Sequence, residues 1–209
     1  SSKKQGRSYQ MNVRSVLAFR EIGKGHNAMT TFNKVMNMPA PLTRRNFTKI
    51  QNKTLLQVVK NLANDSMVNN AFKIRESRND DDRECGVSID GTWQKRGYSS
   101  HNGVVTVISL DTQKCLDTLG IPSCIVVLIK PIYHDLSNPE LLNKCTHGLT
   151  QNANECLNGL IWDRCRKSVY VEQETVALAT YLAVLKFNDG DISWLKLFSD
   201  LDIRRWGFR

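Results

Sequence analysis

The sequence has no long hydrophobic run. Its longest apolar stretch is Ile125-Val-Val-Leu-Ile129, whereas a membrane-spanning helix needs about 18–20 apolar residues. The first residues, Ser1-Ser-Lys-Lys-Gln-Gly6, are polar and do not have the apolar segment of a secretory signal. We therefore expect an intracellular protein, without a membrane partner.

The chain also lacks paired cysteines. None of its six Cys residues belongs to a Cys-x-x-Cys pair, the spacing that typically brings zinc ligands together. In an intracellular protein these residues are expected to be reduced, and buried thiols are their simplest interpretation. Cys145-x-His147 could bind Zn²⁺ only with further ligands in space, for which Cys156 and Cys165 are candidates.

Acidic residues are scarce in the first part of the chain. Residues 1–78 contain 15 Lys/Arg and 3 Asp/Glu, a net charge of +12, while residues 79–209 contain 14 and 17, a net charge of −3. This asymmetry is typical of a polyanion-binding half joined to a near-neutral half, although a well-solvated helical surface would also explain it. The residues expected to contact DNA are Lys24, Arg44, Arg45, Lys49, Lys53, Lys95 and Arg96.

Hydrophobic periodicity predicts helices first and strands later. Apolar residues recur at helical spacing over residues 9–78, with a stop at Gly23-Lys-Gly25 and a break at Pro39 and Pro41. Helix, glycine turn and helix fits a helix-turn-helix DNA reader, as it fits any helical hairpin. Residues 78–83 are charged and rich in turn formers, so we place a domain boundary there, between a basic helical region at 1–78 and a second domain at 84–209.

The second domain is predicted to begin with three antiparallel strands. They lie around Val87–Ile89, at residues 104–108 and at residues 115–116, with hairpin turns at 97–103 and 111–114. Residues 125–129 could form a fourth strand. Two helices follow, at 149–165 and at 176–187, the second capped by Thr175, with a short strand at 169–171 between them. The predicted fold class is α/β, more specifically α+β.

Two acidic residues stand in unlike settings. Asp90 lies in the strand-like Cys85-Gly-Val-Ser-Ile-Asp-Gly-Thr-Trp93, and Glu155 lies in Thr150-Gln-Asn-Ala-Asn-Glu155, at the start of a helix. One carboxylate on a strand and another on a later helix is how a ribonuclease-H-like nuclease holds divalent metal, with at least one more carboxylate between them. Alternatively, Asp90 opens a turn before Gly91, and Glu155 is a solvated helix residue whose neighbouring asparagines hold its carboxylate or cap the helix.

The longer strings around these acids resemble the Mutator-like transposase family. They are Ser88-Ile-Asp-Gly-Thr-Trp-Gln-Lys-Arg-Gly-Tyr-Ser-Ser100 and His147-Gly-Leu-Thr-Gln-Asn-Ala-Asn-Glu155. The resemblance extends over nearly the whole chain. It implies a DDE-type transposase with a ribonuclease-H-like fold, which cuts and joins DNA with Mg²⁺ or Mn²⁺. Asp90 would be the first catalytic acid and Glu155 the last, and both would bind the metal. The resemblance also implies transposon-end DNA as partner, homo-oligomerisation, nuclear location and a Cys/His element at Cys145 and His147, with Zn²⁺ or a structural role.

One departure from the family pattern concerns the second catalytic Asp. Only 64 residues separate Asp90 from Glu155, and the strand end that carries this Asp in the family has no counterpart between them. Asp111, Asp117 and Asp135 precede Glu155, but none ends an apolar strand, and Asp189 and Asp191 follow it. We therefore interpret the chain as an internally deleted member with a truncated ribonuclease-H-like domain and impaired catalysis. The rivals are a working nuclease in which a carboxylate from residues 111–135 replaces the lost Asp, and a non-catalytic nucleic-acid-binding module that uses the basic half.

Overall fold

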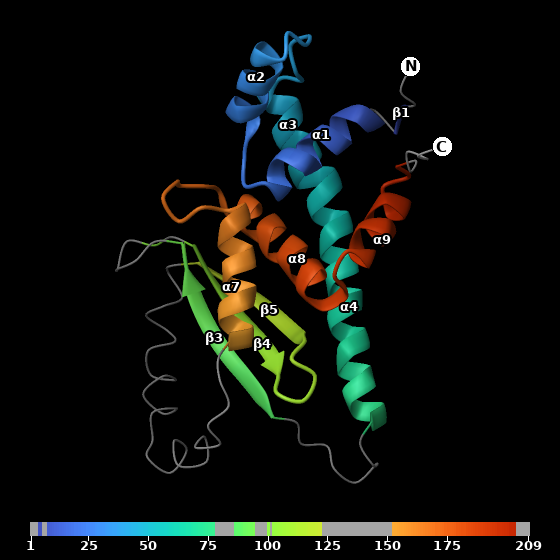
Figure 1. The fold of residues 1–209 in the computed structure, drawn as a ribbon, viewed down its shortest axis with the longest axis vertical. Helices are drawn as coiled ribbons and strands as arrows, with labels where there is room; N and C mark the ends of the chain where they lie inside the picture. The colour runs from blue at the N-terminus through green and yellow to red at the C-terminus, as the bar shows by residue number, and fades with distance from the viewer. Residues whose placement is uncertain are drawn as a thin grey trace.

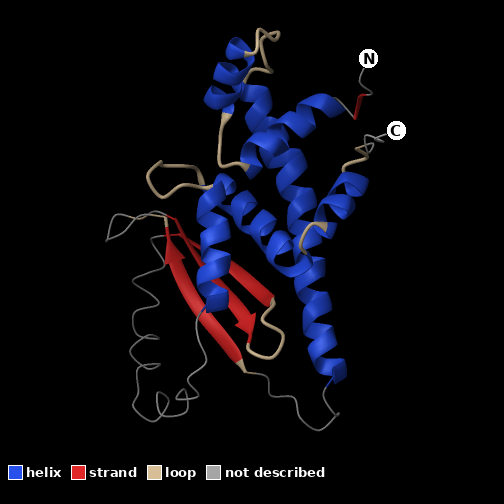
Figure 2. Cartoon of the chain, in the orientation of Figure 1, coloured by secondary structure: helices blue, strands red, loops and turns tan. Residues whose placement is uncertain are grey.

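The computed structural model describes residues 4–5, 8–77, 86–94, 100, 102–122 and 152–203. Helices and one three-stranded sheet form its architecture (Figures 1 and 2), which confirms the α+β prediction. The N-terminal elements are β1 (Lys4–Gln5), β2 (Ser8–Tyr9), α1 (Gln10–Glu21), α2 (His26–Val35), α3 (Arg44–Ile50), the π-helix η1 (Gln51–Leu55) and α4 (Leu56–Ser77). The later elements are β3 (Val87–Trp93), β4 (Asn102–Ser109), β5 (Cys115–Pro122), α7 (Asn152–Arg164), α8 (Gln173–Asp189) and α9 (Ile192–Asp200).

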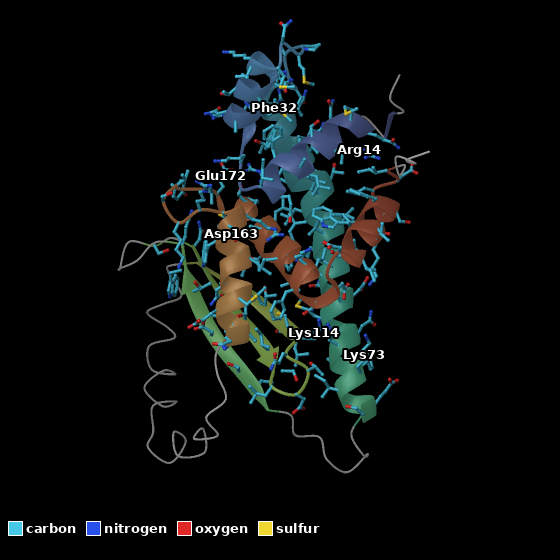
Figure 3. The ribbon with its side chains drawn as sticks, in the orientation of Figure 1. Arg14, Phe32, Lys73, Lys114, Asp163 and Glu172 are labelled. Carbon is cyan, nitrogen blue, oxygen red and sulfur yellow. The ribbon has the colours of Figure 1, made fainter. Side chains whose placement is uncertain are left out.

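The glycine turn after α1 is where the sequence predicts it. Gly23 has φ +68°, a backbone conformation that favours glycine. A Cβ atom at Gly23 would also lie 2.4 Å from the carbonyl oxygen of Asp163, which Figure 3 labels on α7. Glycine is therefore needed here both for the turn and for the close approach of α1 to α7.

Helix α8 forms the centre of the helical layer. Figure 1 shows it between α7 and α4, and it packs against both. Helix α4 contributes a stripe at four- and seven-residue spacing, made of Val59, Ala63, Met67 and Ile74. Residues from both sides of the expected boundary belong to one hydrophobic cluster. A division into domains 1–78 and 84–209 stays a prediction.

The sheet has three strands at the predicted places, in the antiparallel order β3-β4-β5. Strand β4 begins at Asn102, inside the turn predicted at 97–103, so that part of the prediction is wrong. The predicted turn between β4 and β5 is also present, and Ser109 Oγ accepts hydrogen bonds from the backbone N–H groups of Asp111 and Thr112 at 3.2 and 3.3 Å. Lys114, labelled in Figure 3, donates from its Nζ to the carbonyl oxygen of Asn188 at 2.8 Å. This contact joins the sheet to the end of α8.

The two faces of the sheet have different surroundings. Side chains alternate along a strand, so Ser88, Asp90 and Thr92 share one face, and α7 packs on it. The opposite face carries Ile89 and Leu119, which are 61% and 62% exposed. Asp90 thus lies on the face that the helices cover.

Three local predictions need correction or lie outside the described residues. Residues 169–171 form no strand. Thr175 does not cap α8, since Glu172 is the N-cap, and the hydroxyl of Thr175 instead accepts a hydrogen bond from Gln51 Nε2 at 3.0 Å. The proposed fourth strand at 125–129 is not among the described residues. No helix in the described part of the chain has both the length and the apolar character to cross a membrane.

Candidate functional site: acids on a strand and a helix, and a basic hollow

A ladder of side-chain hydrogen bonds joins α7 to β3. The pairs, with the α7 donor first, are Asn154 with Ser88, Asn158 with Asp90 at 2.6 Å and Trp162 with Thr92 at 2.8 Å. Four helix residues rise about 6.0 Å, and two strand residues rise about 6.6–6.8 Å. A helix and a strand that run in the same direction can therefore keep three such pairs in register.

This ladder places the helix of Glu155 against the strand of Asp90. Asp90 is half-buried in the middle of β3, and its Oδ2 accepts the bond from Asn158 Nδ2. Glu155 is exposed, three residues before Asn158, so its Cβ lies about 5–6 Å from that of Asn158 on one side of the helix. Asn154 and Asn158 direct their amide N–H groups at β3. This differs from both roles considered from the sequence, in which the asparagines hold Glu155 or cap the helix.

Asp117 lies on the other face of the sheet. Asp90 pairs with Thr106 across β3 and β4. Asp117, by contrast, pairs with Val107, which pairs with Ile89. Because directly paired residues share a face, Asp117 lies opposite to Asp90 and cannot join it at one cation.

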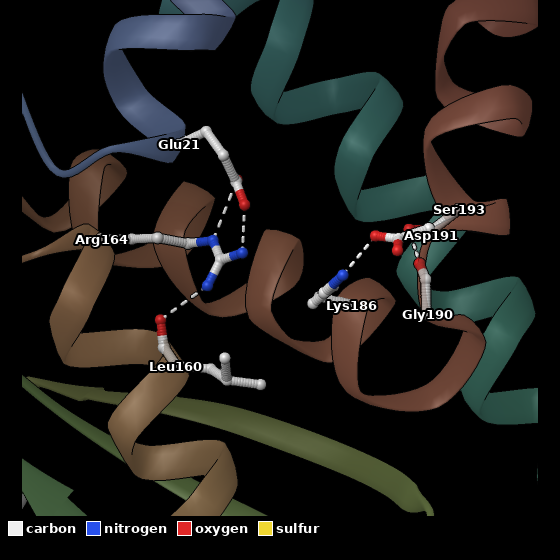
Figure 4. A network of polar contacts seen from close by, with 7 residues as sticks. All are labelled: Glu21, Leu160, Arg164, Lys186, Gly190, Asp191 and Ser193. Carbon is white, nitrogen blue, oxygen red and sulfur yellow. Dashed lines mark hydrogen bonds and ion pairs between the residues drawn. The ribbon is translucent and has the colours of Figure 1, made fainter.

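The remaining candidate acids are engaged elsewhere or lie outside the described residues. Asp189 accepts hydrogen bonds from Ser66 Oγ at 3.0 Å and from Lys196 Nζ at 3.1 Å, and Asp191 pairs with Lys186 (Figure 4). Asp111 lies in the β4–β5 turn, and Asp135 is not described. Among the described residues, no three His, Cys, Asp or Glu side chains form a group that could hold a metal ion.

The side chains near Asp90 carry oxygen atoms, the type of ligand that a hard divalent cation prefers. Carboxylate and amide oxygens are the ligands that Mg²⁺ and Mn²⁺ prefer. Besides the two carboxylates, the Oδ1 atoms of Asn154 and Asn158 are buried and accept no hydrogen bond. Asp90 on β3 and Glu155 on the helix that packs against it are the residues that would hold a cation, and the two amide oxygens belong to the same helix as Glu155.

A basic hollow lies on the surface of α3 and η1. It has a volume of about 840 Å³, and its lining is Thr43, Arg45, Asn46, Thr48, Lys49, Asn52 and Lys53. Residues 22–64 contain no Asp or Glu, so no carboxylate of this stretch offsets the charge. Arg45, Lys49 and Lys53 are spaced by four residues. In an α-helix, residues four apart differ in direction around the helix axis by about 40°. The wider π-turn of η1 reduces that difference, so the three cations stay on one side.

The other expected DNA contacts are more dispersed. Arg44 is exposed and donates to Asn27 Oδ1 at 3.3 Å, and Lys24 lies in the turn between α1 and α2. Lys95 and Arg96 lie outside the described residues. Trp93, the residue before the last described position of this strand region, is half-buried, and a Cβ on Gly103 would lie 2.5 Å from its ring. The Trp93 ring therefore packs across the hairpin.

A known protein family is similar to this chain over more than half of its length. The model described as Mutator-like transposase matches residues 1–120, which include the helices that form the basic hollow and the strand that carries Asp90. The chain belongs to the Mutator-like transposase family. No curated protein and no solved structure matches it. The matched residues end before α7, so the family model itself does not cover Glu155.

Two cysteines of this Mutator-like chain can be placed relative to each other. Cys156 is exposed on α7 and Cys165 is buried just after it. Nine helical residues span about 13.5 Å, whereas a zinc ion holds each sulfur at about 2.3 Å. These two thiols cannot bind one zinc ion together. Cys145 and His147 lie outside the described residues, so their zinc-binding role stays a prediction.

We expect the described cysteines to differ sharply in reactivity. Burial raises the pKa of the Cys165 thiol to about 11 and that of Cys115 to about 12. Since the thiolate is the reactive form, almost none of either reacts at pH 8, and Cys156 should be labelled first. Mass-spectrometric mapping of iodoacetamide adducts measures this order, with urea-unfolded protein as the control. Early labelling of Cys165 in the folded protein would contradict its burial.

A partly buried ion pair joins α1 to the end of α7. Arg164 donates from Nε to Glu21 Oε2 at 2.9 Å, and its Nη2 pairs with Oε1 of the same carboxylate (Figure 4). The Arg164 side chain is 7% exposed and that of Glu21 is 22% exposed. Arg164 Nη1 also donates to the carbonyl oxygen of Leu160 at 2.9 Å. The helix that carries Glu155 is thus fastened directly to the N-terminal helices.

Proposed function

We propose that this transposase-derived protein binds DNA, holds a divalent cation between Asp90 and Glu155, and has lost efficient strand transfer. The hydrogen bond from Asn158 to Asp90 carries the proposal, because it brings the helix of Glu155 onto the strand of Asp90. Membership of a transposase family supports DNA as the partner and a divalent metal as the cofactor. A ribonuclease-H-like ancestry explains a strand acid beside a helix acid.

Each residue of the pair would contribute differently. A bound Mg²⁺ or Mn²⁺ would polarise a phosphate oxygen and lower the pKa of a bound water. Asp90 is held rigidly, since it lies within β3 and one of its oxygens accepts the Asn158 bond. Glu155 is exposed and can adjust to the cation. With two carboxylates instead of three, the cation would be held weakly, so we expect impaired cleavage and joining.

The test of this function combines Mn²⁺ binding with nicking of supercoiled DNA. We expect weak Mn²⁺ binding, measured by electron paramagnetic resonance, that falls by at least about tenfold in Asp90→Asn and in Glu155→Gln, because even the loss of a residue that supports a metal ligand typically costs about 10–100-fold. Asp189→Asn is the matched control, because its carboxylate lies with Ser66 and Lys196. Nicking should be absent or slight in all four proteins.

Two outcomes would decide against parts of this proposal. Strong nicking that both variants abolish would show that another carboxylate completes the site and that the enzyme is active. Mn²⁺ binding that is absent, or that neither variant changes, would remove the cation site from the proposal altogether.

A second candidate function is nucleic-acid binding without any chemistry. The basic hollow on α3 and η1 favours it, since this surface lies on the N-terminal helices and involves neither Asp90 nor Glu155. Such a module would bind DNA or RNA equally well in Asp90→Asn and wild-type proteins, with or without divalent metal. Its affinity would fall steeply with added salt, because binding releases condensed cations from the phosphates.

A further inference from the structure

We propose that Asn158 is a ligand of the divalent cation, which would take its side-chain oxygen together with the carboxylates of Asp90 and Glu155. This inference rests on the proposed cation site and goes beyond it, because it adds a neutral third oxygen ligand to the two carboxylates. The occupant is a hard cation such as Mg²⁺ or Mn²⁺.

The first observation is an unmet hydrogen-bonding need on the inner side of α7. The Oδ1 atoms of Asn154 and Asn158 are both buried and accept no hydrogen bond. Asn154 is only 1% exposed, so bulk water does not supply the missing bond. A buried polar atom without a partner costs about 1–3 kcal/mol. The present amide orientation of Asn158 therefore leaves its oxygen unsatisfied, and a half-turn of the amide would direct this oxygen at a cation beside Asp90.

The second observation is the distance from Asn158 to Asp90. The amide nitrogen lies 2.6 Å from Asp90 Oδ2, and a half-turn of the amide group exchanges the positions of its nitrogen and oxygen. Neighbouring oxygen ligands of Mg²⁺, at 2.0–2.1 Å from the ion in octahedral geometry, are about 2.9 Å apart. The pair already has nearly this separation. Without a cation, the amide nitrogen faces the carboxylate because two oxygens would repel each other.

The third observation is that Asn158 is held on both sides. The bonds from Asn154 to Ser88 and from Trp162 to Thr92 lie one helical turn before and after it. The second of these bonds is fully internal, since Trp162 and Thr92 are each 8% exposed. Asn154 and Trp162 therefore act as positioning residues, which fix the height of α7 on β3 and place Asn158 beside Asp90.

The same ladder also positions Glu155, the third proposed ligand. Glu155 lies in the turn between Asn154 and Asn158, so the register that joins Asn158 to Asp90 places Glu155 about 4.5 Å from Asn158 along the helix axis. The three proposed ligands thus come from two elements with one fixed register. Two carboxylates and one neutral amide give a less negative site than three carboxylates, which suits a weakly bound cation.

The first part of the test measures Mn²⁺ affinity of the full chain by electron paramagnetic resonance. We expect Asn158→Leu, which is similar in size and cannot bind a cation, to weaken Mn²⁺ binding by about 10–100-fold. Asn64→Leu, on the exposed side of α4, should leave the affinity unchanged. If Asp90→Asn and Glu155→Gln weaken binding while Asn158→Leu does not, the cation site stands and the role of Asn158 is refuted. If the wild-type protein binds no Mn²⁺, both proposals fail together.

The second part distinguishes a ligand from a residue that only supports Asp90. Asn158→Cys replaces a hard oxygen with a soft thiolate, which prefers Cd²⁺, and Cys156→Ser is included to remove the exposed thiol nearby. We expect the Asn158→Cys protein to gain a cadmium–thiolate charge-transfer absorption and tighter Cd²⁺ binding, which Asp90→Asn then weakens. The comparison protein carries Asn64→Cys in the same Cys156→Ser background. Equal Cd²⁺ binding by both folded proteins, as judged by circular dichroism, would overturn the assignment.

Discussion

Replacing Glu21 by alanine is expected to lower the free energy of unfolding by about 3 kcal/mol, because removal of one partner leaves a buried charge without compensation. The Arg164 side chain is only 7% exposed and pairs with Glu21 through two of its nitrogens. Its remaining bond, to the carbonyl oxygen of Leu160, cannot neutralise the charge. Urea unfolding followed by circular dichroism measures the change.

The control for this experiment is the second ion pair in Figure 4, between Lys186 and Asp191. Its side chains are 38% and 83% exposed, and solvent-exposed pairs contribute less than about 1 kcal/mol. Asp191→Ala should therefore have a small effect. Arg164→Met in the Glu21→Ala background should recover part of the lost stability, since no buried charge remains. Equal destabilisation by Glu21→Ala and Asp191→Ala would show that the α1–α7 pair is not buried in solution.

Replacing Arg45, Lys49 and Lys53 together by glutamine is expected to lower the affinity for duplex DNA by roughly 500-fold at 0.1 M monovalent salt. In the counterion-release description, each neutralised phosphate contributes about 0.9 to the log–log salt slope, or roughly eightfold at this salt concentration. Three contacts therefore account for this loss and for a salt slope that is smaller by about 2.7. Fluorescence anisotropy of a labelled duplex, titrated at several salt concentrations, measures both quantities.

The matched control removes three positive charges from α4, which directly continues α3 and η1. Lys60, Lys73 and Arg75 are exposed on α4 and do not line the hollow. Their triple glutamine variant should keep most of the affinity. If both triple variants lose affinity equally, the basic charge acts as a diffuse field and the hollow is not a binding surface. A flat salt response of the wild-type protein would argue against phosphate contacts of any kind.

The family assignment and the geometry concern different parts of the protein. The family match covers the basic helices and most of the sheet. The contact between the strand of Asp90 and the helix of Glu155 depends on α7, which lies beyond the matched residues. Ancestry is therefore established by the first part of the chain. Retention of a cation site depends on the docking of α7, for which the Mn²⁺ measurements are the direct test.

Local patterns were sufficient to predict most helices and strands. The helices of residues 9–78, the stop at Gly23 and the three antiparallel strands depend on hydrophobic spacing and on glycine, which act over a few neighbouring residues. The N-cap of α8 was predicted wrongly because the side chain in question makes a contact with a residue distant in sequence. Thr175 has the chemistry of a cap, but its hydroxyl binds Gln51, which is distant in sequence.

The candidate site was only half visible in the sequence. Asp90 and Glu155 could be selected because of their settings, and the four-residue spacing of Asn154, Asn158 and Trp162 matches the two-residue spacing of Ser88, Asp90 and Thr92. That match does not specify which helix face meets which strand face. Either asparagine could equally have capped the helix or contacted Glu155.

The sequence by itself determined the charge asymmetry, the helical and strand segments and the resemblance to a transposase family, because these depend on composition and on local periodicity. Tertiary structure decided that Asp90 faces α7, that Asp117 faces the other way, and that Asn158 lies at Asp90. Strand pairing assigns each side chain to a face, and the docking of α7 then selects which side chains meet on it. Both steps depend on packing between residues distant in sequence, including Asn158 and Asp90, which are 68 positions apart.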